Sequence, residues 1–188
     1  LPLALALHWL VERFAPAWRL PLLAGLSFAF YGYWDWRFLP LLGFSILLNW
    51  LIAEAFQKTK AGALITLAIV ATLAVLAVFK YFNFFADLAG MIPGLPAPKL
   101  DLALPLGISF FTFHHVMYLT DLRRGEAPRY DLVRYALYIA FFPQVLAGPL
   151  VRWREIMHQF DERPYLRSDA AERIARGLIL LTIGLAKK

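Results

Sequence analysis

The chain consists of long apolar runs separated by short polar segments, which is the pattern of successive membrane-crossing helices. A bilayer core requires roughly 20 apolar residues for each helix. The runs cover residues 1–11, 18–34, 37–53, 62–86, 103–119 and 174–186. Residues 62–86 form the clearest span, and the first and last runs read as pieces of spans. The pattern therefore predicts an all-α, polytopic integral membrane protein.

Two segments interrupt this pattern with proline and glycine. The segment "MIPGLPAPKLD" at 91–101 carries three prolines and predicts an ordered loop outside the membrane, because proline breaks a helix interior. Residues 135–151 begin like a helix, but Pro143 and the Gly148–Pro149 step break it.

The charged residues orient the predicted spans. If the first four spans are antiparallel, the segments 12–19, 54–61 and 120–134 lie on one side. That side holds Arg13, Arg19, Lys58, Lys60, Arg123, Arg124, Arg129 and Arg134, and the opposite side holds Arg37, Lys80 and Lys99. Cytoplasmic loops carry an excess of Lys and Arg. We therefore expect the first side to be cytoplasmic and the N-terminal end to lie outside.

The same rule favours a re-entrant path for 135–151. The segment 150–176 is also rich in arginine, and a full span at 135–151 would place it outside. A stretch that enters and returns keeps it cytoplasmic. Irregular backbone at membrane depth must be buried in protein or line a wet cavity. The stretch therefore predicts a cavity-forming element.

After Pro149 the apolar positions take a helical period. They fall at i, i+3, i+4 and i+7 and are Trp153, Ile156, Met157 and Phe160. Arg152 and Arg154 flank this stripe, which predicts an interfacial helix lying flat with its arginines at the headgroups. Asp169 and Glu172 then form a capping pair that predicts the start of the last helix.

Composition supports lipid as the solvent. The chain is 61% hydrophobic and 16% aromatic, against about 45–50% apolar in soluble domains. The basic residues that give the net charge of +6 lie between the apolar runs, as in the loops of membrane proteins, so we expect no nucleic-acid partner. Without cysteine, disulfides and thiolate chemistry are excluded for this chain. The aromatic residues Tyr31, Tyr33, Trp34 and Trp36 predict an interfacial belt.

No catalytic constellation is evident. His114 and His115 are adjacent, so their side chains diverge by about 100° on a helix and do not form one metal pair. We expect them to be structural or tunnel-lining, and we expect no metal site. Ser109 lacks the flanking pattern of a nucleophile. Arg152 and Arg154 suit either a phosphate-bearing donor or a lipid headgroup.

Five short motifs occur in an order that resembles membrane-bound O-acyltransferases. They are "FKYFNFF" (79–85), "LPLGISFFTF" (104–113), "YLTDLRRG" (118–125), "FFPQVLAGPLVRWREI" (141–156) and "GLILLTIGLAKK" (177–188). The resemblance covers nearly the whole chain. It points to the bacterial branch that acetylates alginate and related exopolysaccharides, alongside the D-alanyl-transfer branch of teichoic acid.

The resemblance implies a ring of tilted and re-entrant helices around a funnel, with residues 1–188 the N-terminal part of one membrane domain that is incomplete at both ends. The family histidine lies in a Trp-His-Gly type motif. None of His8, His114, His115 and His158 precedes glycine, so we expect the catalytic histidine beyond Lys188 and none in this chain. By this resemblance, the residues expected at the donor entrance or in the funnel are Arg152, Arg154, Gln144, Pro143, Gly148, Pro149 and Ser109.

The implied reaction is O-acetylation of an exported polysaccharide such as alginate or cellulose. The donor would be a cytoplasmic acyl thioester, either acetyl-CoA or an acyl carrier, with no tightly bound cofactor. The implied location is the bacterial inner membrane, with membrane lipid and periplasmic acetyl-transfer proteins as partners. The alternatives are the D-alanyl-transfer branch, and a non-enzymatic module such as a transporter fragment or a scaffold of a polymer-export complex.

Overall fold

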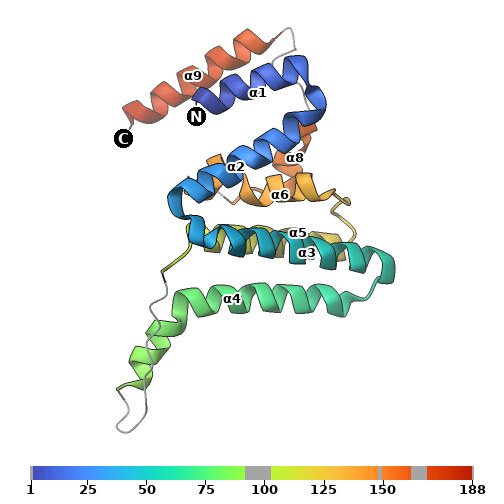
Figure 1. Ribbon diagram of the computed structural model, residues 1–188, viewed down its shortest axis with the longest axis vertical. Coiled ribbons are helices and arrows are strands. Elements are labelled where there is room, and N and C mark those ends of the chain that lie inside the picture. The colour runs from blue at the N-terminus through green and yellow to red at the C-terminus, as the bar shows by residue number, and fades with distance from the viewer. Residues whose placement is uncertain (1, 92–102, 148–149, 162–168, 188) are drawn as a thin grey trace.

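The computed structural model describes residues 2–91, 103–147, 150–161 and 169–187, and within these ranges the regular structure is entirely helical (Figure 1). The α-helices are α1 (Pro2–Phe14), α2 (Arg19–Asp35), α3 (Leu39–Thr59), α4 (Gly62–Ala89), α5 (Ile108–Arg123), α6 (Leu132–Ala140), α7 (Phe142–Ala147), α8 (Trp153–Asp161) and α9 (Ala170–Ala186). Two short 3-10 turns, η1 (Pro16–Trp18) and η2 (Trp36–Phe38), lead into α2 and α3.

Helices α2 to α6 form the body of the molecule as stacked, roughly antiparallel layers (Figure 1). α4 packs on α3 and α5, and α2 packs on α6. The core lies between these layers and includes the fully buried Leu42, Ile65, Leu119 and Leu137. Apolar side chains also cover the outside of α4, where Leu67 and Val70 are exposed. Such an outer surface suits lipid or further protein better than water.

The structure confirms helices at the predicted runs 18–34, 37–53 and 62–86, as α2, α3 and α4. The stretch Pro16–Thr59 and helix α4 are each long and apolar enough to cross a membrane. The run predicted at 103–119 becomes helical only at Ile108, because Gly107 adopts a left-handed φ of 66° just before it. The predicted loop at 91–101 lies almost wholly outside the described residues.

Three of the four residues of the predicted aromatic belt have the exposed side chains that such a belt needs, and their place at a membrane interface stays a prediction. Tyr33, Trp34 and Trp36 are exposed, whereas Tyr31 is only 3% exposed. Tyr31 shares one face of α2 with the buried residues Ala24 and Ser27, at the spacing of two helical turns. That face packs on α6, so tertiary packing removes Tyr31 from the belt.

The predicted start of the last helix is also confirmed, since α9 follows Asp169 directly. The side chain of Asp169 makes no capping hydrogen bond, however, and Glu172 pairs with Arg176 one turn further on at 2.5 Å. The side chains described along α9 are exposed throughout.

Three side-chain contacts place the predicted loops 54–61 and 120–134 at the same end of the bundle. Trp50, in the second half of α3, donates its indole N–H to the carbonyl of Tyr130 at 3.1 Å. Glu54 accepts from Arg129 at 2.7 Å. Arg123 reaches Thr66 near the start of α4 at 2.9 Å. Two of the three segments in the charge argument therefore lie at one end of the bundle, and which side is cytoplasmic stays a prediction.

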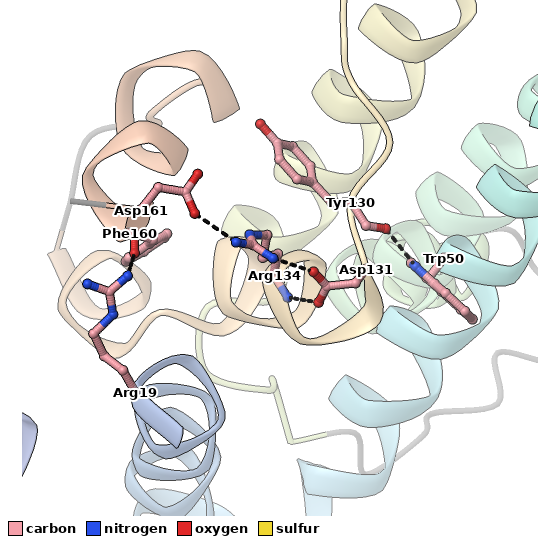
Figure 2. A network of polar contacts seen from close by, with 7 residues as sticks. All are labelled: Arg19, Trp50, Tyr130, Asp131, Arg134, Phe160 and Asp161. Atoms are coloured by element: carbon pink, nitrogen blue, oxygen red, sulfur yellow. Dashed lines mark hydrogen bonds and ion pairs between the residues drawn. The ribbon is translucent and has the colours of Figure 1, made fainter. Parts of the chain in front are cut away.

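A buried ion pair ties the N-terminal helices to α8. Glu12 on α1 is 2% exposed and Arg19 at the start of α2 is 9% exposed, with 3.8 Å between Oε1 and Nη1. Arg19 also donates to the carbonyl of Phe160 on α8 (Figure 2). His8 lies 4.0 Å from Glu12 on the other side. A buried charge is tolerated only when it is paired and hydrogen-bonded, so this group holds three helices together.

The loop arrangement predicts a labelling pattern. Single cysteines replacing Lys58 and Arg124 in a cysteine-free version of the full-length protein should both resist an impermeant thiol reagent in intact cells. A cysteine at Tyr33, at the opposite end of α2, should react. Labelling of Lys58→Cys and Arg124→Cys with protection of Tyr33→Cys would show the opposite orientation. Labelling of only one of Lys58→Cys and Arg124→Cys would contradict the fold.

The buried pair predicts a large and specific loss of stability. Arg19→Met should lower the free energy of unfolding by about 3 kcal/mol, because it leaves the Glu12 carboxylate buried without its arginine. Glu12→Gln in the same chain should restore part of the loss. Thermal unfolding in detergent measures both, with the exposed Arg13→Met as control. An Arg19→Met protein as stable as Arg13→Met would show that the Glu12–Arg19 pair does not stabilise the fold.

Candidate functional site

The predicted break in 135–151 is present. α6 ends at Ala140, and Phe141 leaves the helix with φ −54° and ψ 108°. Pro143 then sits in the first turn of α7. It has no N–H for the carbonyl of Ile139, and its ring would clash there if α6 continued. Pro143 therefore accounts for the end of α6, and the Gly148–Pro149 step lies outside the described residues.

The broken stretch begins and ends at the same end of the bundle. Asp131 caps the start of α6 by accepting the N–H of Arg134 at 3.0 Å. The Arg134 guanidinium bonds Asp131 at 2.7 Å and Asp161, at the end of α8, at 2.8 Å (Figure 2). The hydrogen bonds to Asp161 and Asp131 raise the pKa of Arg134 above its ordinary value, so its guanidinium is charged. Glu126 and Arg154 add a second link at 2.9 Å.

The predicted stripe of α8 is confirmed, but it packs on protein. Ile156, Met157 and Phe160 are buried. The ring of Phe160 meets Phe141 edge-on at 5.2 Å, and the indole of Trp153 donates to Asp121 at 3.0 Å. The stripe of the expected interfacial helix is thus buried against α6 and its neighbours. A headgroup contact can therefore come only from the polar side of α8.

The predicted arginines occupy that polar side and differ in their surroundings. Arg154 is paired with Glu126 and lies over the ring of Trp153 at 5.4 Å. Arg152 is exposed, and no hydrogen bond or ion pair joins its guanidinium to another residue in the described ranges. Arg152 is therefore the more available of the two cations for an anionic ligand.

The other predicted site residues are dispersed. Pro143 is exposed, whereas Gln144 is 8% exposed and its Oε1 has no hydrogen-bond partner among the described residues. Ser109 lies in the first turn of α5, about 18 Å along the helix from Asp121, to which α8 is bonded. The structure therefore joins the arginines to α5 at one end and leaves Ser109 near the other.

A network of hydrogen-bonded polar side chains, not predicted from the sequence, joins α3, α4, α5 and α6. Thr72 donates to Asn49 at 3.2 Å, and Asn49 donates to the carbonyl of Ser45 at 2.9 Å. The Ser45 oxygen lies 3.4 Å from Nε2 of His115, and Tyr135 lies 2.6 Å from Nδ1. Ser45 and Asn49 lie in one apolar run and Thr72 lies in another, so only tertiary packing reveals that they are linked.

The hydrogen bonds of this polar network support the structural role expected for His115. Because Ser45 donates its hydroxyl hydrogen to the carbonyl of Leu42 at 2.8 Å, its oxygen accepts from Nε2–H of His115. Tyr135 then donates to Nδ1. Both ring nitrogens are occupied, which leaves no open base.

His114 is not part of this polar network. Its ring packs edge-on against Tyr138 at 5.1 Å, so the two adjacent histidines do not converge, as expected. Among the described residues no cluster of three or more His, Asp or Glu side chains is placed to hold a metal ion.

Comparisons with known proteins give a consistent set of relatives. Over 94% of its length the chain is 35% identical to a probable alginate O-acetylase of Azotobacter vinelandii, of which the match covers 37%. It is 34% identical to a probable alginate O-acetylase of Pseudomonas aeruginosa, over 100% of the chain and 37% of the relative. It is 31% identical to a peptidoglycan O-acetyltransferase of Helicobacter pylori, over 86% of the chain and 36% of the relative.

The chain thus spans a little over a third of the length of these curated relatives. No family model and no solved structure matches it. The long apolar helices and the relatives together support a membrane location. Over nearly its whole length the chain is thus similar to O-acetylases, which are members of the membrane-bound O-acyltransferase family.

Proposed function

We propose that the full-length protein, of which this chain forms part, is a membrane-embedded O-acetyltransferase that modifies an exported polysaccharide. The observation that carries the proposal is the 31–35% identity to proteins named as O-acetylases of alginate and peptidoglycan. Both named acceptors are sugar polymers with free hydroxyl groups. The proposal places the protein as a multi-pass protein of the bacterial inner membrane, with an acetyl thioester as donor on the cytoplasmic side.

The reaction is a direct acyl transfer. A hydroxyl oxygen of the acceptor attacks the thioester carbonyl, an O–C bond replaces the S–C bond, and the thiol leaves with the proton. A histidine beyond Lys188 would take the hydroxyl proton as general base. The described histidines do not suit this task, since His115 has both ring nitrogens bonded and His114 is buried against Tyr138.

In this proposal the returning stretch, residues 135–151, helps to shape the donor-side wall of the funnel. α6 has nine residues and is about 14 Å long, less than half of a bilayer core. A re-entrant segment fits this length, and the bonds from Arg134 and Arg154 support a return to the side on which it began. Of the expected entrance residues, Pro143 and Gln144 would belong to this wall, and Gly148 and Pro149 lie outside the described residues.

Arg152 is proposed to hold the anionic part of the donor at the entrance. It is exposed at the start of α8, and Arg154 beside it is committed to Glu126. A thioester carried on CoA or on an acyl carrier brings phosphate groups, which arginine binds through charge-assisted hydrogen bonds.

The entrance role predicts a specific kinetic effect. Arg152→Ala should raise the donor concentration needed for half-maximal acetyl transfer about tenfold, because a hydrogen bond to a charged group contributes about 1.5–3 kcal/mol. Acetyl transfer by the full-length protein in membranes, at normalised protein levels, measures this. Arg13→Ala, another exposed cation at the same end, is the control. An unchanged donor dependence in Arg152→Ala would leave only a headgroup contact for Arg152.

The structural role of the histidines predicts retained activity. His115→Gln keeps a donor and an acceptor for Ser45 and Tyr135, and His114→Ala removes a ring with no hydrogen bond among the described residues. Each variant should keep measurable acetylation in the full-length protein. Complete loss in either variant, with normal expression and an unchanged melting temperature, would assign that histidine to the chemistry.

A further inference from the structure

A groove of about 360 Å³ lies between α3, α4 and α5, apart from the returning stretch. Its walls are almost entirely apolar and include Phe44, Leu48, Leu67 and Val75, all of which are also exposed on the outer surface. The groove therefore opens on the face of the two helical stretches that are apolar enough to cross a membrane.

Three of the polar residues that line this groove, Ser45, Asn49 and Thr72, are linked by hydrogen bonds. Thr72 donates to Asn49, and Asn49 donates to the carbonyl of Ser45. Because these hydrogen bonds are made within the protein, the groove does not require polar groups from an occupant. A hydrocarbon chain suits such a surface.

One end of the groove meets a group of cations. Leu67 lines the groove and follows Thr66, whose hydroxyl accepts from Arg123 at 2.9 Å. On α3, Ile52 lines the groove about 9 Å before Lys58 along the helix axis. The cationic end consists of Lys58, Lys60, Arg123 and Arg124, all exposed.

These four cations differ from the other arginines at this end of the bundle. Arg129, Arg134 and Arg154 are each paired with a carboxylate. Within the described ranges no ion pair joins Lys58, Lys60, Arg123 or Arg124 to a carboxylate; Lys60 bonds the Gln57 amide and Arg123 bonds Thr66. The charge beside the groove is therefore uncompensated and favours an anion.

The length of the groove fits one leaflet. Along α3 its lining runs from Leu41 to Ile52, a rise of about 16 Å, and half of a bilayer core is about 15 Å. The cations lie beyond the Ile52 end. A lipid whose headgroup lies at the cations would extend its acyl chain along the groove toward Leu41.

We propose that this groove binds an anionic phospholipid of the leaflet on the basic side, with its phosphate at the cationic end and one acyl chain between α3 and α4. Charge complementarity selects the headgroup, and the apolar walls hold the chain. The inference is independent of acetyl transfer, so its test requires no activity.

The test uses the full-length protein in nanodiscs that contain equal amounts of phosphatidylglycerol and phosphatidylcholine. Native mass spectrometry counts the lipids that stay bound, and a phosphatidylglycerol with a photoreactive acyl chain marks their position. We expect preferential retention of phosphatidylglycerol and crosslinks to α3 or α4 residues that line the groove. Arg123→Gln should weaken the preference about fivefold, as expected for one cation near an anionic headgroup. Arg37→Gln, at the opposite end, should not.

A second variant tests the acyl chain itself. Ala71 lines the groove, and Ala74 is exposed three residues further along α4 but does not line it. Ala71→Phe should therefore abolish the groove crosslinks while Ala74→Phe keeps them. Equal retention of the two lipids by the unaltered protein, or crosslinks confined to other surfaces, would overturn the proposal. The second result would show that another part of the full-length protein covers the groove.

Discussion

The hydrogen bonds of Arg134 to Asp131 and Asp161 set the path of the chain after α5. One guanidinium joins the first turn of α6 to the last turn of α8, across 27 positions (Figure 2). These carboxylates are more than half exposed, so the bonds contribute modestly to stability on their own. Their importance is geometric, because together with the bond from Arg19 to Phe160 they join the end of α8 to the starts of α6 and α2.

The buried groups contribute more to stability than these exposed ones. Glu12 and Arg19 are both at least nine-tenths buried, and replacing one member of such a pair costs several times more than breaking a surface pair. The same distinction applies to α8. Its apolar stripe is fixed by burial on α6, so the exposed Arg152 beside it is available for binding, whereas Arg154 is paired with Glu126.

Much of the helical layout could be predicted from the sequence, because an apolar run of membrane length and a proline each have one dominant structural effect. Pro143 is an example: its missing N–H alone predicts the end of α6. Tyr31 could not be predicted, since only the packing of α2 on α6 distinguishes it from Tyr33. The polar network through Asn49 and His115 was likewise invisible, because it depends on which helices become neighbours. The motif resemblance agrees with the relatives found by comparison. The expected site residues include Ser109, which lies far along α5 from the arginines.

The bond from Arg19 to Phe160 has a consequence for folding during synthesis. It joins residues 141 positions apart, so α1 and α2 are synthesised long before α8. During that interval Arg19 has Glu12 but lacks the α8 carbonyl, and α2 lacks the α6 face that buries Tyr31. The early helices are thus held in an incomplete state until the later segment docks. Because such long-range contacts form slowly, this docking is the step at which assembly of the chain is most open to error.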